Sequence, residues 1–152
     1  MIKTGTISTN NKARHLYKLE DEIEAGIVLN GDEVKSLRMG HCDLKDSFVE
    51  VINGQAYVID MNIPQYAMSH LGSNPKRKRK LLLHKLQIRR LAAKTLQGGY
   101  TCVPISIYFN DKGFVKIRIA IAHGKKLFEH KDQIIRRDNE RELSRAIKQR
   151  ET

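Results

Sequence analysis

Hydrophobic and polar residues alternate most sharply along residues 100–122, whose sequence is YTCVPISIYF-NDKG-FVKIRIAIA. Apolar side chains recur at every second position from residue 103 to 109, and again from residue 115 to 121. A period of two is typical of strands that bury one face. The segment is therefore predicted to be a β-hairpin that carries Lys116 and Arg118 on its outward face.

A second hairpin is predicted over residues 47–61, with the sequence SFVEVI-NG-QAYVIDM. Two runs rich in strand-forming residues flank Asn53-Gly54, a preferred two-residue turn because both turn positions need positive φ. Residues 16–29 begin with a mixed pattern and end apolar, as expected for a strand that enters a core.

Two segments have the pattern of helices. Residues 33–38 are predicted to form about two turns, with Val34 and Leu37 on one buried face and Gly40 as the stop. A longer helix is predicted from about residue 84 to residue 97, ended by Gly98-Gly99. Its apolar stripe consists of Ile88, Leu91, Ala92 and Leu96.

The remaining segments are polar. Residues 1–10 are expected to be a flexible arm, and residues 62–80 a loop. Twelve of the 22 residues from 131 to 152 are charged, so this part is expected to be a tail that is disordered when free. Residues 1–130 would form one domain of five or six strands and two or three helices. Antiparallel hairpins in a chain of this size favour a mainly β fold, best matched by a five-stranded oligonucleotide-binding barrel.

Composition then points to a charged partner. Net charge is +11 and the pI about 9.8, which indicates a polyanion, either nucleic acid or an anionic membrane. No apolar run approaches the ~20 residues of a spanning helix, and the N-terminus lacks the apolar core of a signal peptide. Cys42 and Cys102 are isolated, which argues against a disulfide framework or zinc site and favours a cytoplasmic protein.

Basic residues gather in three clusters. Residues 76–94 carry nine positive charges and no acid, which fits either phosphate contacts or a solvated surface. The second cluster lies on and after the last predicted strand: Lys116, Arg118, Lys125 and Lys126. The third is an N-terminal arm of Asn10, Asn11, Lys12, Arg14 and His15, whose amides could bond bases or ribose.

Support for enzyme chemistry or for a cofactor is thin. The six histidines form no HxxxH or HxH pattern, and neither a GxSxG motif nor a P-loop is present. We therefore expect no metal, no cofactor and no catalytic residue. Aromatic content is 6% with no Trp, which favours recognition of folded RNA by shape and backbone over a wide base-stacking platform.

Several motifs together resemble a known family. EAGIVLNGDEVKSLRMGHCDLKDSF, RKLLLH, YTCVPISIYF and HGKKL occur in the order and spacing of the bacterial SsrA-binding protein (small protein B) family. The resemblance covers nearly the whole chain from about residue 11. It implies an oligonucleotide-binding-type barrel with about three helices, and an RNA-binding adaptor that is not an enzyme.

The resemblance also implies partners. The family binds the transfer-RNA-like domain of transfer-messenger RNA and delivers it to stalled ribosomes in trans-translation, together with elongation factor Tu. The C-terminal tail is expected to enter the empty message channel near the decoding site and become helical there. A monomer in the bacterial cytoplasm is expected.

The site residues carried over by motif fall into two groups. The carboxylate of Glu24 could accept two bonds from a guanine edge or be an ordinary acid at a strand start. Glu33 is expected at the RNA surface, unless it pairs with Lys35 or Arg38, and Leu82 is expected in the core. The predicted RNA-binding set is Asn10, Asn11, Arg14, Glu24, Glu33, Lys35, Arg38, Lys116, Arg118, Lys125 and Lys126. The predicted ribosome-contacting tail set is Phe128, Glu129, His130, Lys131, Arg136 and Arg137.

Two departures from the family pattern stand out. Asp43 occupies a position where the family has Asn, and Glu129-His130-Lys131 replaces Asp-Lys-Arg. Asp43 brings a negative charge toward the RNA side, so either this position does not face phosphate or affinity is slightly lower. The alternative functions are a constitutive ribosomal or general RNA-binding protein and an RNA-cleaving or RNA-modifying enzyme.

Overall fold

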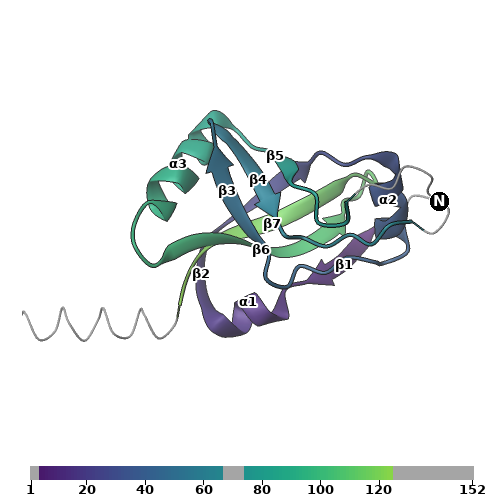
Figure 1. Cartoon of the computed structure of the whole chain (residues 1–152), viewed down its shortest axis with the longest axis horizontal. Helices are drawn as coiled ribbons and strands as arrows, with labels where there is room; N and C mark the ends of the chain where they lie inside the picture. Colours follow the sequence, from purple (N-terminus) through teal and green to yellow (C-terminus); the bar gives the residue numbers. More distant parts are fainter. Residues whose placement is uncertain (1–3, 67–73, 125–152) are drawn as a thin grey trace, which may run out of the picture.

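A computed structural model describes residues 4–66 and 74–124 of the 152-residue chain (Figure 1). All named strand pairs are antiparallel. In chain order the elements are β1 (Gly5–Thr9), α1 (Asn11–Leu16), β2 (Tyr17–Ile27), α2 (Gly31–Arg38), β3 (Phe48–Ile52), β4 (Gln55–Ile59), β5 (Arg79–Leu82), α3 (Lys85–Thr95), β6 (Tyr100–Phe109) and β7 (Val115–Gly124). The predicted class, a mainly β antiparallel barrel with three helices, is confirmed.

The sheet closes into a ring. Its strand order is β1-β6-β3-β4-β5-β2-β7, and β7 returns to pair with β6. Six strands therefore form the ring, and β1 adds to β6 outside it. The five-stranded barrel named as the best match has one strand fewer than this ring. The strand not predicted is β5, which links β4 to β2 and whose first two residues fall in the segment expected to be a loop.

The hairpin of β6 and β7 contributes much of the hydrophobic core. The inward residues of β6 and β7 include Ile105, Ile107, Ile117 and Ile119, each 0% exposed. Helices cover the two ends of the barrel (Figure 1): α2 contributes the buried Leu37, and α3, at the other end, contributes Ile88 and Leu91. The predicted face is correct for β7 and for Ile107 and Phe109. In the first half of β6 it is wrong, because a register shift between Pro104 and Ser106 puts Cys102 in the main core and Val103 in a second cluster with Ala13 and Ala122.

Local backbone signals also hold. Asn53 and Gly54 have φ of 50° and 75°, as the two-residue turn between β3 and β4 requires. Helix α2 begins at a capping box, in which the Asn30 side chain accepts from the Glu33 N–H and the Glu33 side chain accepts from the Asn30 N–H. Gly40, at φ 80°, follows its end.

Three sequence expectations are wrong. Residues 5–9 are not a flexible arm, because β1 pairs with the part of β6 from Ser106 to Phe109. Backbone hydrogen bonds suffice for such an edge, so a polar segment can join it. Leu96 does not lie on the buried stripe of α3; it is 87% exposed at the helix end. Leu82 is 56% exposed rather than in the core, whereas its neighbour Leu81 is buried.

Within residues 4–66 and 74–124, no helix is long and apolar enough to cross a membrane.

Candidate nucleic-acid interface

An outward strip crosses β2, β7 and β6 at the middle of the barrel. In the strand register Glu24 lies opposite Arg118, and Gly26 lies opposite Lys116. Tyr108 of β6 lies opposite Lys116 on the other side. Three predicted site residues, Glu24, Lys116 and Arg118, therefore meet on one surface. We call Glu24, Tyr108, Lys116 and Arg118 the outward strip.

Tyr108 organises this strip. Its hydroxyl donates a hydrogen bond to the carboxylate of Glu24, and the guanidinium of Arg118 lies 5.7 Å from the centre of its ring. Partial burial raises the pKa of Tyr108, and the hydrogen bond to Glu24 and the charge of Glu24 raise it further. The phenol therefore stays protonated and continues to donate at neutral pH.

A hollow of about 460 Å³ adjoins the outward strip. Its walls combine a carboxylate, two amines, two amides and an exposed leucine. They include Glu24, Gly26, Gln55, Lys80, Leu82, His84, Gln87 and Lys116. The hollow brings together polar groups from four strands and from α3, as a surface that reads RNA by shape would.

Leu82 and Lys80 were missed as members of this surface. Leu82 points outward because the alternation along β5 turns Arg79 and Leu81 inward. Gly26 lies opposite it, and a Cβ on Gly26 would lie 3.2 Å from the Leu82 Cβ. The glycine thus makes room for the leucine. The signal in the sequence was the alternation of RKLL: Arg79 and Leu81 are buried, while Lys80 and Leu82 are exposed.

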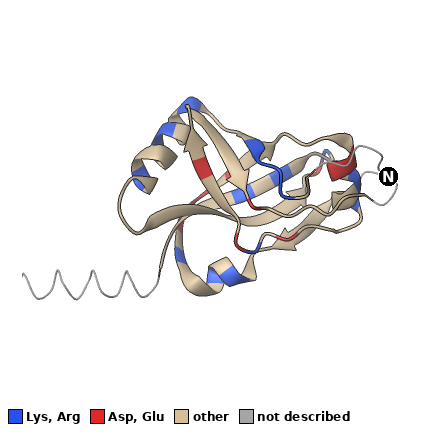
Figure 2. Cartoon of the chain, in the orientation of Figure 1, with Lys and Arg blue, Asp and Glu red and all other residues tan. Residues whose placement is uncertain are grey.

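Basic positions continue beyond the outward strip, on β5 and α3 (Figure 2). On α2, Lys35 and Arg38 are exposed as predicted. The amine of Lys35 lies 5.5 Å from the centre of the Tyr66 ring.

The expectation that Glu33 shares this exposed face is wrong. Glu33 is 4% exposed, and its partners are neither Lys35 nor Arg38. One carboxylate oxygen accepts from Arg77 at 2.5 Å and the other accepts from the Nε of Arg79. Burial alone would raise the pKa of Glu33, but the bonds from Arg77, the Asn30 backbone and Arg79 outweigh it and the pKa is lowered. Glu33 is an ionised internal anchor.

The N-terminal asparagine is likewise internal. Asn10 is 4% exposed, and its amide donates to the carbonyl oxygens of Leu44 and Pro104 at 3.2 and 2.9 Å. Its oxygen accepts from the Ala13 N–H at 3.1 Å, which caps α1. The expected RNA contact is replaced by a capping role, because the buried amide uses its hydrogen bonds inside the protein. Asn11 and Arg14 lie exposed on α1.

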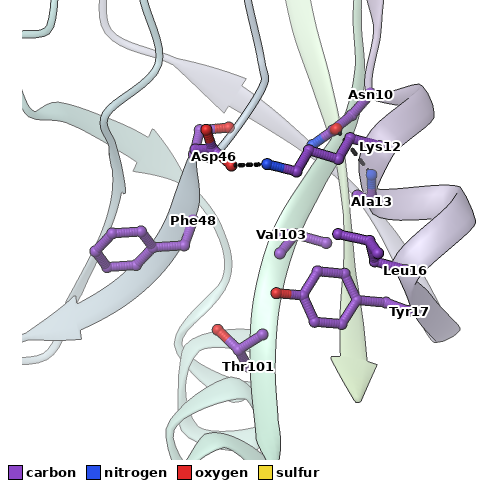
Figure 3. Close-up of a pocket in the computed structure, with 10 residues that line it drawn as sticks. Asn10, Lys12, Ala13, Leu16, Tyr17, Asp46, Phe48, Thr101 and Val103 are labelled. Carbon is purple, nitrogen blue, oxygen red and sulfur yellow. Dashed lines mark hydrogen bonds and ion pairs between the residues drawn. The ribbon is translucent and has the colours of Figure 1, made fainter. Parts of the chain in front are cut away.

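Helix α1 borders a second hollow, of about 340 Å³ (Figure 3). Leu16, Tyr17, Phe48 and Val103 give it an apolar lining. Lys12 reaches across its rim to the carboxylate of Asp46 at 2.6 Å. This hollow lies at the start of β2, nine residues before Gly26, so the structure does not gather α1 and the outward strip into one patch.

Asp43 forms a turn at the surface. One carboxylate oxygen accepts from the Lys45 N–H at 2.8 Å, and its backbone pairs with Asn62. The side-chain oxygen of an asparagine could accept the same bond. Asp43 therefore keeps the local geometry, and it shares a hollow of about 390 Å³ with Lys45 and Lys76.

Both cysteines within the described ranges are unpaired. Burial raises the pKa of Cys42 and of Cys102 to about 12, so neither is a thiolate at neutral pH. Across residues 4–66 and 74–124, no group of three His, Cys, Asp or Glu residues is placed to hold a metal ion. Lys125, Lys126 and the whole predicted tail set, from Phe128 to Arg137, lie outside the described residues.

Comparisons with known proteins agree on one family. Residues 7–149 match the model of the SmpB protein family. The SsrA-binding protein of Caldicellulosiruptor saccharolyticus is 47% identical over 94% of this chain and 90% of its own length. That of Ruminiclostridium cellulolyticum is 46% identical over 98% of each. A solved structure described as "tmRNA-SmpB: a journey to the center of the bacterial ribosome" has a TM-score of 0.67 and 45% identity, covering 78% of this chain and 83% of that one.

Proposed function

The chain belongs to the SmpB protein family, and from that premise we propose that it is an RNA-binding adaptor of trans-translation. It binds transfer-messenger RNA through the barrel and brings it to stalled ribosomes. The names of its relatives and of the structural neighbour support both partners. The RNA element bound is the transfer-RNA-like domain, and the role is binding rather than catalysis.

The observation that carries the proposal is the outward strip, in which a carboxylate stands among cations. Lys116 and Arg118 attract phosphates, whereas Glu24 would repel them. An acid at this place is therefore best explained by base reading, in which the carboxylate accepts from N1–H and N2–H₂ of a guanine. The Tyr108 hydroxyl orients the carboxylate, and the exposed Leu82 offers an apolar surface for an unstacked base or a ribose.

Other predicted residues take supporting roles. Lys35 and Arg38 on α2, and Asn11 and Arg14 on α1, are exposed and are proposed as peripheral contacts to the same RNA or to ribosomal RNA. Asn10 and Glu33 are buried and are not among the proposed contacts.

The C-terminal part supplies the ribosomal half of the function. Lys125 and Lys126, which follow β7 in the sequence, are proposed as further phosphate contacts. Phe128, Glu129, His130, Lys131, Arg136 and Arg137 contact ribosomal RNA as the tail occupies the message channel near the decoding site and becomes helical. The charge density of residues 131–152 supports this role, because a segment that folds on binding sets its ordering cost against new charge contacts. The protein acts in the bacterial cytoplasm as a monomer with elongation factor Tu, which joins through the RNA.

The proposal is tested by measuring the affinity for an in vitro transcript of the transfer-RNA-like domain against an unrelated transfer RNA. Glu24→Gln should weaken binding to the first by about tenfold, as the loss of one bidentate base contact would. It should leave affinity for the second unchanged or slightly higher, because a negative charge is lost. If Glu24→Gln instead raised the affinity for both RNAs equally, base reading by Glu24 would be contradicted.

The division between barrel and tail is tested by deleting residues 132–152. The truncated protein should bind the transfer-RNA-like domain with wild-type affinity and fail to support tagging of stalled chains. Loss of RNA affinity would show that the two parts do not act separately. The rival role, a constitutive ribosomal protein, predicts that the protein sediments with ribosomes in stoichiometric amounts.

A further inference from the structure

The most basic run of the chain, KRKRK at residues 76–80, is split into two faces. Lys76, Lys78 and Lys80 are exposed. Arg79 is 0% exposed, and the Arg77 side chain is 36% exposed. The alternation of exposed and buried side chains continues through Leu81 and Leu82, with the period of two expected for the strand β5. Five like charges in sequence thus have different surroundings.

The inward arginines are held by the protein itself. Around Arg79, the Nε donates to Glu33, one terminal nitrogen donates to the Met61 carbonyl at 2.7 Å, and the other donates to the Pro75 carbonyl at 2.8 Å. Arg77 donates to the second oxygen of Glu33. Glu33 in turn closes the capping box of α2. One carboxylate therefore ties the helix to β5 and to the segments before it.

The use of arginine inside and lysine outside follows from their chemistry. A guanidinium presents several donors in a fixed plane and can satisfy a carboxylate and two carbonyls at once. A lysine amine is a compact charge on a flexible stem, suited to meeting a phosphate at the surface.

The outward lysines lead away from the outward strip. Lys80 lines the same hollow as Glu24 and Lys116. The amine of Lys78 lies 5.6 Å from the centre of the Tyr57 ring, and Tyr57 pairs with Lys80 across β4 and β5. Lys76 borders the hollow at Asp43 and Lys45. Side chains two residues apart on an extended chain are about 6.6–7 Å apart, which is the spacing expected between Lys78 and Lys80; Lys76 lies in the turn before them.

We propose that Lys76, Lys78 and Lys80 form a lysine row that binds the RNA phosphate backbone and extends the outward strip along β5, and that the buried Glu33–Arg79 pair is the positioning device that turns this face of KRKRK toward the RNA. This rests on the proposed RNA-binding function. A shift of one residue would turn every side chain of the segment to the opposite face. Such a shift would place lysines in the core and would remove from the Glu33 carboxylate the two guanidinium groups that bind it. The buried Glu33–Arg79 pair therefore fixes which face of the segment points outward.

The lysine row is tested by the salt dependence of binding to the transfer-RNA-like domain. Lys78→Gln/Lys80→Gln should lower the slope of log affinity against log salt by about 1.4 to 1.8, since each phosphate contact contributes about 0.7 to 0.9. The matched control, Lys18→Gln/Lys112→Gln, removes two exposed charges from the start of β2 and from the β6–β7 turn, outside the proposed RNA contacts. It should lower the slope by less than half as much. An equal fall in the two variants would show that only net charge matters and would overturn the lysine row.

The positioning role is tested by a change whose electrostatic and structural effects have opposite signs. Glu33→Gln removes a negative charge, so long-range electrostatics alone would strengthen RNA binding. If Glu33 positions the lysine row, the variant instead binds about fivefold or more weakly and with a lower salt slope. The control Glu50→Gln makes the same charge change at an exposed site on β3 and should bind as tightly as wild type or slightly more tightly.

Folding is monitored by circular dichroism in the same buffer. If Glu33→Gln is unfolded at the assay temperature, the comparison uses Glu33→Asp, which keeps the charge but shortens the reach to Arg79. A folded Asp variant should still lose at least about twofold in affinity. Wild-type or tighter binding by a folded Glu33 variant overturns the positioning role.

The outcomes separate this inference from the proposed function. If wild-type protein does not distinguish the transfer-RNA-like domain from other RNA, the proposed function fails whatever the lysines do. If Lys116→Ala and Arg118→Ala weaken binding while Lys78→Gln/Lys80→Gln does not lower the salt slope, the lysine row alone is wrong.

Discussion

Glu24 and Glu33 are two acids in a basic chain, and both are predicted from sequence to meet RNA. In the structure Glu33 is 4% exposed and binds Arg77 and Arg79, whereas Glu24 is exposed and binds the Tyr108 hydroxyl beside Arg118. Each is a glutamate with arginine nearby. Glu33 and Arg79 form an ion pair closed to water, whereas Glu24 and Arg118 both contact Tyr108 on a surface that water can reach.

This difference in solvent exposure suits Glu33 and Arg79 to a structural role and Glu24 and Arg118 to a binding role. A buried ion pair is expensive to break, because removing one partner leaves the other charged and unsolvated. An exposed pair contributes little to stability, because water replaces either partner easily. For the same reason Glu24 and Arg118 are free to exchange their contacts with Tyr108 for the proposed contacts with RNA, whereas Glu33 and Arg79 hold the segments that carry the other proposed contacts.

The largest effect should come from truncating Arg79, and the same change at Arg118 is the comparison. Arg79→Met leaves the Glu33 charge buried with only Arg77, and should lower the free energy of unfolding by about 3–5 kcal/mol. Arg118→Met should change it by less than about 1 kcal/mol. Urea unfolding followed by circular dichroism measures both. If the two variants lost similar amounts of unfolding free energy, burial would not explain the difference between Arg79 and Arg118.

A smaller effect is expected in acid. The pKa of Glu33 in the folded protein is lowered from 4.5, so its contribution to stability is fully present above pH 4.5 and is lost as the pH falls through the folded-state value. Glu33→Gln should therefore flatten the fall in stability below pH 4.5. Glu24→Gln, which removes an exposed carboxylate, is the control and should keep the wild-type profile. Thermal unfolding at a series of pH values from 7 downward makes the comparison.

The smallest effect should follow Tyr108→Phe, which removes only the hydroxyl that orients Glu24. A single partly exposed hydrogen bond contributes about 0.5–1.5 kcal/mol at most, so the unfolding midpoint should hardly move. Affinity for the transfer-RNA-like domain should fall about two- to fivefold, because the carboxylate is no longer held in place. Unchanged affinity together with unchanged stability would show that Glu24 needs no such support.

Much of the fold could be predicted from local patterns. The period of two gave both hairpins, Asn53-Gly54 gave a turn with positive φ at both positions, and the apolar spacing gave α2 and α3. These signals act within a few residues and depend on backbone sterics. Strands β1 and β5 were missed because they are polar or highly charged, and they exist as strands because partner edges on β6, β4 and β2 are available to them.

The candidate site was only partly predictable. Lys116 and Arg118 were placed correctly because the alternation of β7 puts them opposite a buried row. Leu82 was placed in the core because its run of three leucines reads as apolar. Its outward position follows from the pairing of β5 with β4 and β2, in which Arg79 and Leu81 face inward, and Gly26, 56 residues away in the sequence, leaves room for it.

The sequence by itself determined the charge of this protein, its two hairpins, helices α2 and α3 and its family, because composition, periodicity and motif order are properties of the chain. It did not show α1. Only the tertiary structure decided which charges face water. Asn10, Glu33 and Arg79 look as polar in sequence as Glu24 and Lys80, but they lie inside because partners from distant segments supply their hydrogen bonds. Burial of a charge depends on such partners, and closure of the barrel brings them together.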